Sequence, residues 1–181
     1  MPFTLVPCQL AGLYEIWPKV LSDKRGYFFE SYSERDFAAI GISSSFVQDN
    51  QSSSTKGVLR GLHFQKEHPQ GKLIRVITGD VFDVAVDIRP DSPTRGKWHG
   101  ITLSGEKHNQ FYIPPGFAHG FLVLSDTAIL SYKCTDFYYP EDEGGIIWDD
   151  PTIGIIWPEL GMEYILSEKD RKLPLWRETG Q

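Results

Sequence analysis

Residues 72–90, KLIRVITGDVFDVAVDIRP, contain two runs rich in β-branched residues on either side of Gly79 and Asp80. A dipeptide of this kind is favoured in two-residue hairpin loops, so the sequence predicts two strands joined in a tight hairpin. Side chains alternate between the faces of a strand, so in the second run one face is apolar and the other is partly acidic. The partly acidic face carries Val81, Asp83, Ala85 and Asp87.

Similar short runs separated by turn signals recur along the chain, at residues 98–104, 110–115, 120–125 and 128–139. Such a series indicates a β-sandwich or barrel. Short peripheral helices are expected at residues 33–41 and 167–174, because each begins with Ser, has Asp three residues later and ends at Gly or Pro. The 181 residues suit one domain, 1–181, in which the segment 148–161, rich in Pro and Gly, wraps the surface.

The charge and cysteine content narrow the function classes. A net charge of −6 argues against general binding to nucleic acid or anionic membranes, although a few converging cations can still form one local anion site. The N-terminus has no basic region before an apolar run, and no segment approaches the roughly 20 apolar residues of a membrane span. We therefore expect a cytoplasmic protein in which Cys8 and Cys134, the two cysteines, are reduced.

The strand-like segment GVLRGLHFQ, residues 57–65, places Arg60, His63 and Gln65 among apolar residues. Buried polar groups need partners, so these side chains call for an explanation. His63 is either a satisfied histidine at a sheet edge or a general base, and Arg60 favours a planar anionic partner. Residues three apart point to opposite faces of a regular strand, so a shared site requires either a local distortion, for which Gly61 is the natural position, or an Arg60 side chain that curls around the strand edge.

Other candidates have equally plausible structural explanations. Lys72 could be an ordinary solvated lysine, and the helix-capping position alone would account for Asp170. Tyr132 and Tyr138 share a face if their strand is unbroken, which fits either core packing or the wall of a site.

The segment PPGFAHGF, residues 114–121, contains Pro114, Gly116 and His119 in the P-x-G-x-x-H spacing of the second cupin motif, whose histidine binds metal. The first cupin motif needs H-x-H and a downstream Glu, but here Gln65 stands where the second histidine would be. Two histidines without a clear carboxylate partner form a weak site for Zn or Fe. We therefore expect no metal.

Several segments together resemble the dTDP-4-dehydrorhamnose 3,5-epimerase family, in the family's order and from about residue 3 to residue 175. They are residues 22–37, 46–65, 71–89, 113–125, 132–151 and 166–170. The resemblance implies an all-β, metal-free cupin jelly roll (a double-stranded β-helix or sandwich) without a cofactor. It also implies an isomerase of dTDP-L-rhamnose biosynthesis that acts as a homodimer, to which the N-terminal strands contribute.

The resemblance assigns roles to matching positions. It implies that His63 is the catalytic base, Asp170 its paired carboxylate, Tyr132 the proton donor and Lys72 the group beside the substrate's keto oxygen. Tyr138 matches an aromatic that stacks on thymine. The other positions that match substrate-contacting residues are Gln48, Asp49, Asn50, Arg60, His119, Glu143 and Lys169, together with Arg25 and Glu30, which the dimer lends to the neighbouring subunit's site.

These roles are chemically reasonable, because a hydrogen beside a ketone can be removed when the resulting charge moves onto oxygen. A base at C3 and C5 with a donor on the opposite face would invert both carbons of dTDP-4-dehydro-6-deoxy-D-glucose. Three alternatives stay open: a single-carbon epimerase of a related 4-keto-6-deoxy sugar nucleotide, a metal-dependent cupin using His63 and His119, and a non-catalytic sugar-nucleotide binding module.

Overall fold

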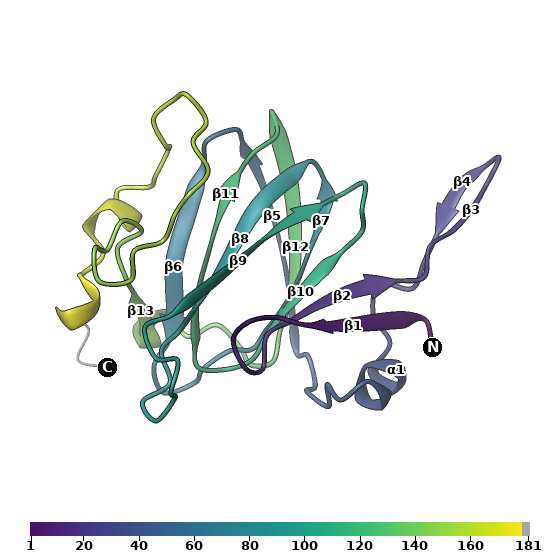
Figure 1. The fold of residues 1–181 in the computed structure, drawn as a ribbon, viewed down its shortest axis with the longest axis horizontal. Helices are drawn as coiled ribbons and strands as arrows, with labels where there is room; N and C mark the ends of the chain where they lie inside the picture. Colours follow the sequence, from purple (N-terminus) through teal and green to yellow (C-terminus); the bar gives the residue numbers. More distant parts are fainter. Residues whose placement is uncertain (179–181) are drawn as a thin grey trace.

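The computed structural model describes residues 1–178 and has two antiparallel β-sheets packed face to face (Figure 1). The six-stranded sheet has the order β1 (Phe3–Pro7), β2 (Tyr14–Pro18), β10 (Gln110–Ile113), β7 (Lys72–Thr78), β12 (Thr127–Cys134) and β5 (Gln48–Thr55). The five-stranded sheet has the order β13 (Glu143–Gly145), β6 (Leu59–Gln65), β11 (Phe117–Val123), β8 (Asp80–Asp87) and β9 (Trp98–Ser104). The predicted all-β jelly roll is confirmed.

The remaining elements are short. A two-stranded hairpin of β3 (Leu21–Asp23) and β4 (Gly26–Phe28) projects away from the body (Figure 1). The helical elements are α1 (Glu34–Ala39), η1 (Pro140–Asp142), η2 (Asp170–Lys172) and η3 (Trp176–Glu178). Within the described part of the chain, no helix is long and apolar enough to cross a membrane.

The predicted tight hairpin over residues 72–90 is wrong. Strand β7 pairs with β10 and β12 in one sheet, whereas β8 pairs with β11 and β9 in the other. The chain therefore crosses between sheets at Gly79, whose φ is +82° and where a Cβ would lie 2.1 Å from the Thr127 carbonyl oxygen. Both runs direct apolar side chains into the same interior, and they do so from opposite layers.

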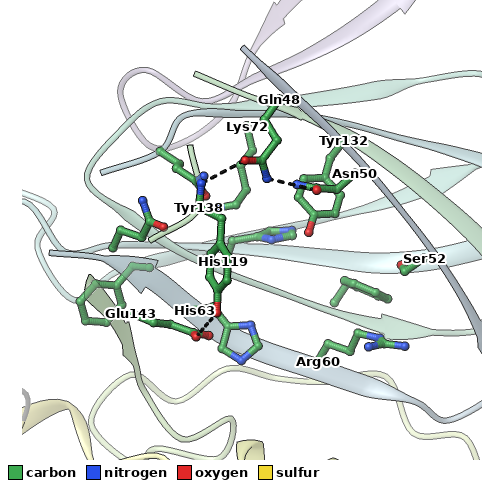
Figure 2. A pocket seen from close by; sticks show the side chains of 14 residues that line it. Gln48, Asn50, Ser52, Arg60, His63, Lys72, His119, Tyr132, Tyr138 and Glu143 are labelled. Atoms are coloured by element: carbon green, nitrogen blue, oxygen red, sulfur yellow. Dashed lines mark hydrogen bonds between the residues drawn. The ribbon is translucent and has the colours of Figure 1, made fainter. Parts of the chain in front are cut away.

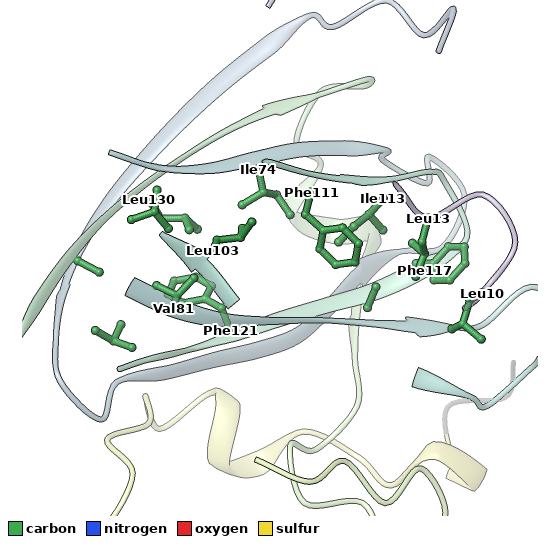
Figure 3. Packing of buried hydrophobic residues seen from close by; sticks show 14 residues of the cluster. Leu10, Leu13, Ile74, Val81, Leu103, Phe111, Ile113, Phe117, Phe121 and Leu130 are labelled. Carbon is green, nitrogen blue, oxygen red and sulfur yellow. The ribbon is translucent and has the colours of Figure 1, made fainter. Parts of the chain in front are cut away.

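The core between the sheets is formed by inward-facing side chains of both layers (Figure 3). Ile74 and Leu130 come from the six-stranded sheet, and Val81 and Phe121 from the five-stranded sheet. The alternation predicted for β8 is confirmed, because Val81 lies in this core while the apolar residues of the other face do not. Burial of such side chains contributes roughly 1.5–3 kcal/mol each.

The C-terminal segment covers the outer face of the five-stranded sheet. Ile153 and Trp157 pack there against Val84 and Val86 of β8. The Trp157 indole N–H donates to the Trp148 carbonyl oxygen at 2.9 Å, so the buried ring has its polar group satisfied. This covering explains why β8 is apolar on its outward face.

The two helix predictions have different outcomes. Helix α1 begins after Ser33, whose hydroxyl oxygen accepts from the Asp36 N–H, and its buried Phe37 lies in a separate apolar cluster with Phe3. Over residues 167–174 the prediction of a helix is wrong in extent, because only the single turn η2 forms. The Asp170 N–H does donate to Ser167 Oγ at 3.0 Å, but the Asp170 carboxylate is directed elsewhere.

The sequence pattern missed strand β5, QDNQSSST, because its residues are polar. It forms at the edge of the six-stranded sheet by pairing with β12 along its whole length. The pattern also extended the strand at 128–139 too far, since β12 ends at Cys134. Both differences affect the site, because β5 and the segment after Cys134 each supply part of its wall.

Candidate active site

The backbone of β6 departs from regular pairing at Gly61. On the neighbouring strand His119 pairs with His63, but Phe121 pairs with Arg60, so Gly120 alone faces two residues of β6. Gly61 has a φ of +120°, and a Cβ there would lie 2.6 Å from the Gly120 Cα. Such a bulge changes which face later residues occupy. Arg60 and His63 consequently line one pocket, which confirms the distortion expected at Gly61.

This pocket has a volume of about 370 Å³ and lies between the two sheets (Figure 2). Strands β5, β7 and β12 form one wall, and β6, β11 and β13 the other. The structure brings together nine of the candidate residues here: Gln48, Asn50, Arg60, His63, Lys72, His119, Tyr132, Tyr138 and Glu143.

His63 is paired with Asp170 across 107 positions of sequence. Its Nε2 lies 2.7 Å from Asp170 Oδ1, and the carboxylate is almost inaccessible to solvent while the ring is half-buried. Burial alone would raise the pKa of Asp170, but hydrogen bonds from His63 and Ser167 lower it below its ordinary value. An ionised carboxylate beside a partly exposed imidazole fixes the orientation of the ring.

A second histidine, His119, is held by Asp83 on β8. Its Nε2 lies 2.9 and 3.0 Å from the two carboxylate oxygens. Lys72 is buried nearby, and desolvation lowers its pKa although Cys134 and Asp83 oppose that effect. Desolvation likewise raises the pKa of Asp83, against the favourable charges of His119 and Lys72. Among the described residues Lys72 has no ion-pair partner, so its ammonium is available to a ligand.

Tyr132 enters the pocket from the sheet opposite His63 (Figure 2). Burial raises the pKa of its hydroxyl, with Cys134 adding to the effect and Arg60 opposing it. The phenol therefore stays protonated at neutral pH and can supply a proton.

Tyr138 lies at the mouth of the pocket, half of its surface exposed. Its hydroxyl donates to Glu143 Oε2 at 2.7 Å, and Lys169 Nζ donates to the same oxygen at 2.5 Å. Burial would raise the pKa of Glu143, but the hydrogen bonds from Lys169 and Tyr138 lower it. Lys169 thus reaches the site through Glu143 rather than by lining the pocket.

Three candidate residues of this chain lie outside its own pocket. Asp49 points to the other face of β5, where Lys133 Nζ donates to it at 2.9 Å. Arg25 sits at the tip of the projecting hairpin and pairs with Asp23, and Glu30 is exposed just beyond β4. The alternation of side chains along β5 places Gln48 and Asn50 in the pocket and excludes Asp49.

The described residues contain no group of three or more His, Cys, Asp or Glu side chains arranged to hold a metal ion. His63 and His119 face each other on neighbouring strands, and each is already bonded to its own carboxylate.

Sequence reasoning missed some residues of the site. Asp83 was recognised only as part of an acidic strand face, although that face points toward the interior. Gln65 is recognised in the sequence only as a polar residue among apolar ones, and the pocket-lining residues that no sequence signal indicated are Ser52, Phe64, Gln70 and Phe121. A period of two along residues 48–52 could have indicated Ser52, had that segment been identified as a strand.

Three comparisons bear on this site. The family model for dTDP-4-dehydrorhamnose 3,5-epimerase matches residues 7–178. The dTDP-4-dehydrorhamnose 3,5-epimerase of Methanothermobacter thermautotrophicus is 55% identical over 178 residues, which cover 98% of this chain and 96% of that protein.

Two solved structures are similar over nearly the whole chain. The dTDP-6-deoxy-D-glucose-3,5-epimerase of Legionella pneumophila, in complex with dTDP-4-keto-L-rhamnose, has a TM-score of 0.94 and 51% identity, covering 97% of this chain and 94% of its own. A 3'-monoepimerase of Streptomyces bikiniensis, in complex with dTDP-quinovose, has a TM-score of 0.86 and 34% identity, covering 93% and 86%.

Proposed function

Because this chain belongs to the dTDP-4-dehydrorhamnose 3,5-epimerase family, we propose that it inverts C3 and C5 of dTDP-4-dehydro-6-deoxy-D-glucose to form dTDP-4-dehydro-L-rhamnose. One observation carries the proposal most strongly. A histidine–carboxylate pair and a tyrosine approach one pocket from different sheets, with a buried lysine beside them. This arrangement suits proton removal and return at carbon without a cofactor.

His63 is the base. Its imidazole removes the proton at C3 and the proton at C5 in separate steps, and the charge of each carbanion moves onto the 4-keto oxygen. Asp170, 2.7 Å away, selects the tautomer of the ring and stabilises the imidazolium. The low pKa of Asp170 keeps this partner ionised at neutral pH.

Lys72 donates to the developing enolate oxygen. Its burial makes this interaction strong, because few waters compete with it and the ammonium has no other charged partner among the described residues. Tyr132 returns a proton from the face opposite His63, which is the geometry that inversion requires.

The nucleotide is held by the polar and aromatic groups toward the mouth. Arg60 donates two N–H groups to Ser54 and has no carboxylate partner among residues 1–178, so it can bind the diphosphate. Tyr138 stacks on the thymine. Gln48, Asn50, His119 and Glu143 complete the contacts.

We further propose a homodimer in which the projecting hairpin reaches a second copy. Tyr27 and Phe28 are 59% and 67% exposed there, which is costly for a monomer in water. Arg25 and Glu30 would then enter the neighbour's site, and Asp49 would contribute from the sheet edge. The free thiols of Cys8 and Cys134 fit a cytoplasmic enzyme.

A single-carbon epimerase is the second candidate, favoured by the similarity to the 3'-monoepimerase. Incubation of the protein with dTDP-4-dehydro-6-deoxy-D-glucose in D₂O, followed by NMR, separates the two. Deuterium at both C3 and C5 with L-rhamno product supports the proposal. Deuterium at one carbon alone would instead identify a single-carbon epimerase.

The role of His63 has its own test. His63→Ala should abolish exchange at both carbons, whereas Tyr132→Phe should retain some exchange and lose inverted product. His99→Ala, outside the pocket, serves as the control. Exchange retained in His63→Ala would remove His63 as the base. Full activity after exhaustive chelation would eliminate a metal-dependent reaction. Lack of any deuterium exchange in the wild-type protein would support a non-catalytic binding module.

A further inference from the structure

The segment from Thr135 to Tyr139 carries Tyr138 but lies between the end of β12 and the start of η1. It therefore lacks a continuous ladder of backbone hydrogen bonds. Backbone groups withdrawn from water need partners, so something else must hold this loop.

Glutamine side chains supply those partners. Gln70 Nε2 donates to the Asp136 carbonyl oxygen at 2.8 Å. Gln48 Oε1 accepts from the Tyr138 N–H at 3.0 Å, and its own Nε2 donates to Asn50 at 3.1 Å. These bonds hold the loop at Asp136 and at the N–H of Tyr138.

Gln65 makes the most extensive contact. Its Nε2 donates to the Phe137 carbonyl oxygen at 3.1 Å and to the His68 carbonyl oxygen at 2.7 Å. Its Oε1 accepts from the Tyr139 N–H at 2.8 Å. Gln65 is only 6% exposed, so these bonds are sheltered from competing water. Gln65 thus hydrogen-bonds to the peptide groups immediately before and after Tyr138.

We propose that Gln65 is a positioning residue for nucleotide recognition, acting through Tyr138. It fixes the backbone of the loop so that the Tyr138 ring is held in place before the ligand arrives, while Glu143 holds the hydroxyl. This inference rests on the proposed function, in which Tyr138 stacks on thymine. Preorganisation of this kind lowers the ordering cost of binding.

The amide of a glutamine offers two N–H donors and a carbonyl acceptor, and Gln65 uses both ends at once. Glutamate would keep the acceptor for Tyr139 but place a carboxylate against two carbonyl oxygens. Methionine would keep the length and lose all three bonds. Methionine therefore removes the whole contact, whereas glutamate removes only the two bonds that Gln65 donates.

The experiment measures the Kd of dTDP together with kcat and KM for the 4-keto sugar nucleotide. Gln65→Met should weaken dTDP binding and raise KM about tenfold, with kcat changed less than about threefold, because the reacting groups are untouched. Gln65→Glu should act in the same direction. Gln110→Met, which removes a buried glutamine outside the pocket, is the matched control and should leave the Kd of dTDP and the KM unchanged.

A double-mutant cycle decides whether Gln65 acts through Tyr138. In a Tyr138→Ala background, Gln65→Met should change the Kd of dTDP less than about twofold, since the ring it positions is gone. An equal effect in both backgrounds, or a native Kd in soluble Gln65→Met, would overturn the inference. If the wild type binds dTDP but catalyses no exchange, the proposed function fails while this binding cycle remains interpretable.

Discussion

Gly61→Ala tests whether the bulge in β6 is what joins Arg60 to His63 in one site. The added Cβ would lie 2.6 Å from the Gly120 Cα and 2.7 Å from the His119 carbonyl oxygen, both of them backbone atoms. A positive φ costs a non-glycine residue roughly 1–2 kcal/mol, and overpacking adds about 1–3 kcal/mol. We therefore expect the free energy of unfolding to fall by about 2–5 kcal/mol.

The control for backbone strain alone is Gly41→Ala. Gly41 has a φ of +97°, but a Cβ there has no atom within 4 Å. This variant should lose only the conformational part, about 1–2 kcal/mol. The difference between the two variants in the free energy of unfolding, determined in urea, thus measures the energetic cost of adding a Cβ where β6 closely approaches β11.

The activity of soluble Gly61→Ala is the decisive measurement. Displacing β6 from β11 moves His63 relative to Lys72 and Tyr132, and misplacement by about 1 Å can cost roughly 100-fold in rate. We expect kcat/KM to fall by that order, with Gly41→Ala unchanged. If Gly61→Ala keeps native activity and loses no more stability than Gly41→Ala, the argument for the bulge is refuted.

Three further substitutions test separate groups. Asp170→Asn should lower kcat by about 100- to 10,000-fold, measured by proton exchange, because His63 loses its ionised partner. Lys72→Met should lower kcat about 100- to 1,000-fold yet leave the melting temperature equal or higher, since a buried unpaired ammonium is removed. Asp87 gives a test by pH. Burial would raise its pKa, but hydrogen bonds from Arg89, Ser92 and Thr94 lower the pKa to about 2. Because the pKa of Asp87 in the folded protein lies below the ordinary 3.8, its carboxylate adds on the order of 2 kcal/mol to the free energy of unfolding above pH 4. This contribution is lost as the pH falls through about 2. Asp87→Asn should remove that contribution from acid unfolding curves, and an unchanged curve would contradict the assignment.

Local patterns in the sequence predicted much of the scaffold. Strand β9 forms over residues 98–104 as predicted, and the faces of β8 follow the period of two. Helix α1 forms where Ser33 and Asp36 indicate a cap. These features depend on neighbours within a few residues, so the chain carries their information in short segments.

The pairing of elements was less predictable. The same dipeptide that is typical of a hairpin, Gly79 and Asp80, here joins two sheets, because each flanking strand finds distant partners. Strand β5 has no apolar pattern and forms by pairing with β12. Local propensity for a turn or strand does not specify which strand lies alongside.

The amino-acid sequence by itself determined the residue types of the site, and the segment 57–65 already contained Arg60, His63 and the glycine that separates them. Local patterns left Asp170 as a helix cap, and the family resemblance paired it with His63; the tertiary structure shows the contact itself, and it alone decided that Gln65 binds the loop of Tyr138. The reason is physical: strand alternation assigns a side chain to a face, but hydrogen-bond partners across long loops depend on how the two sheets and the C-terminal segment pack.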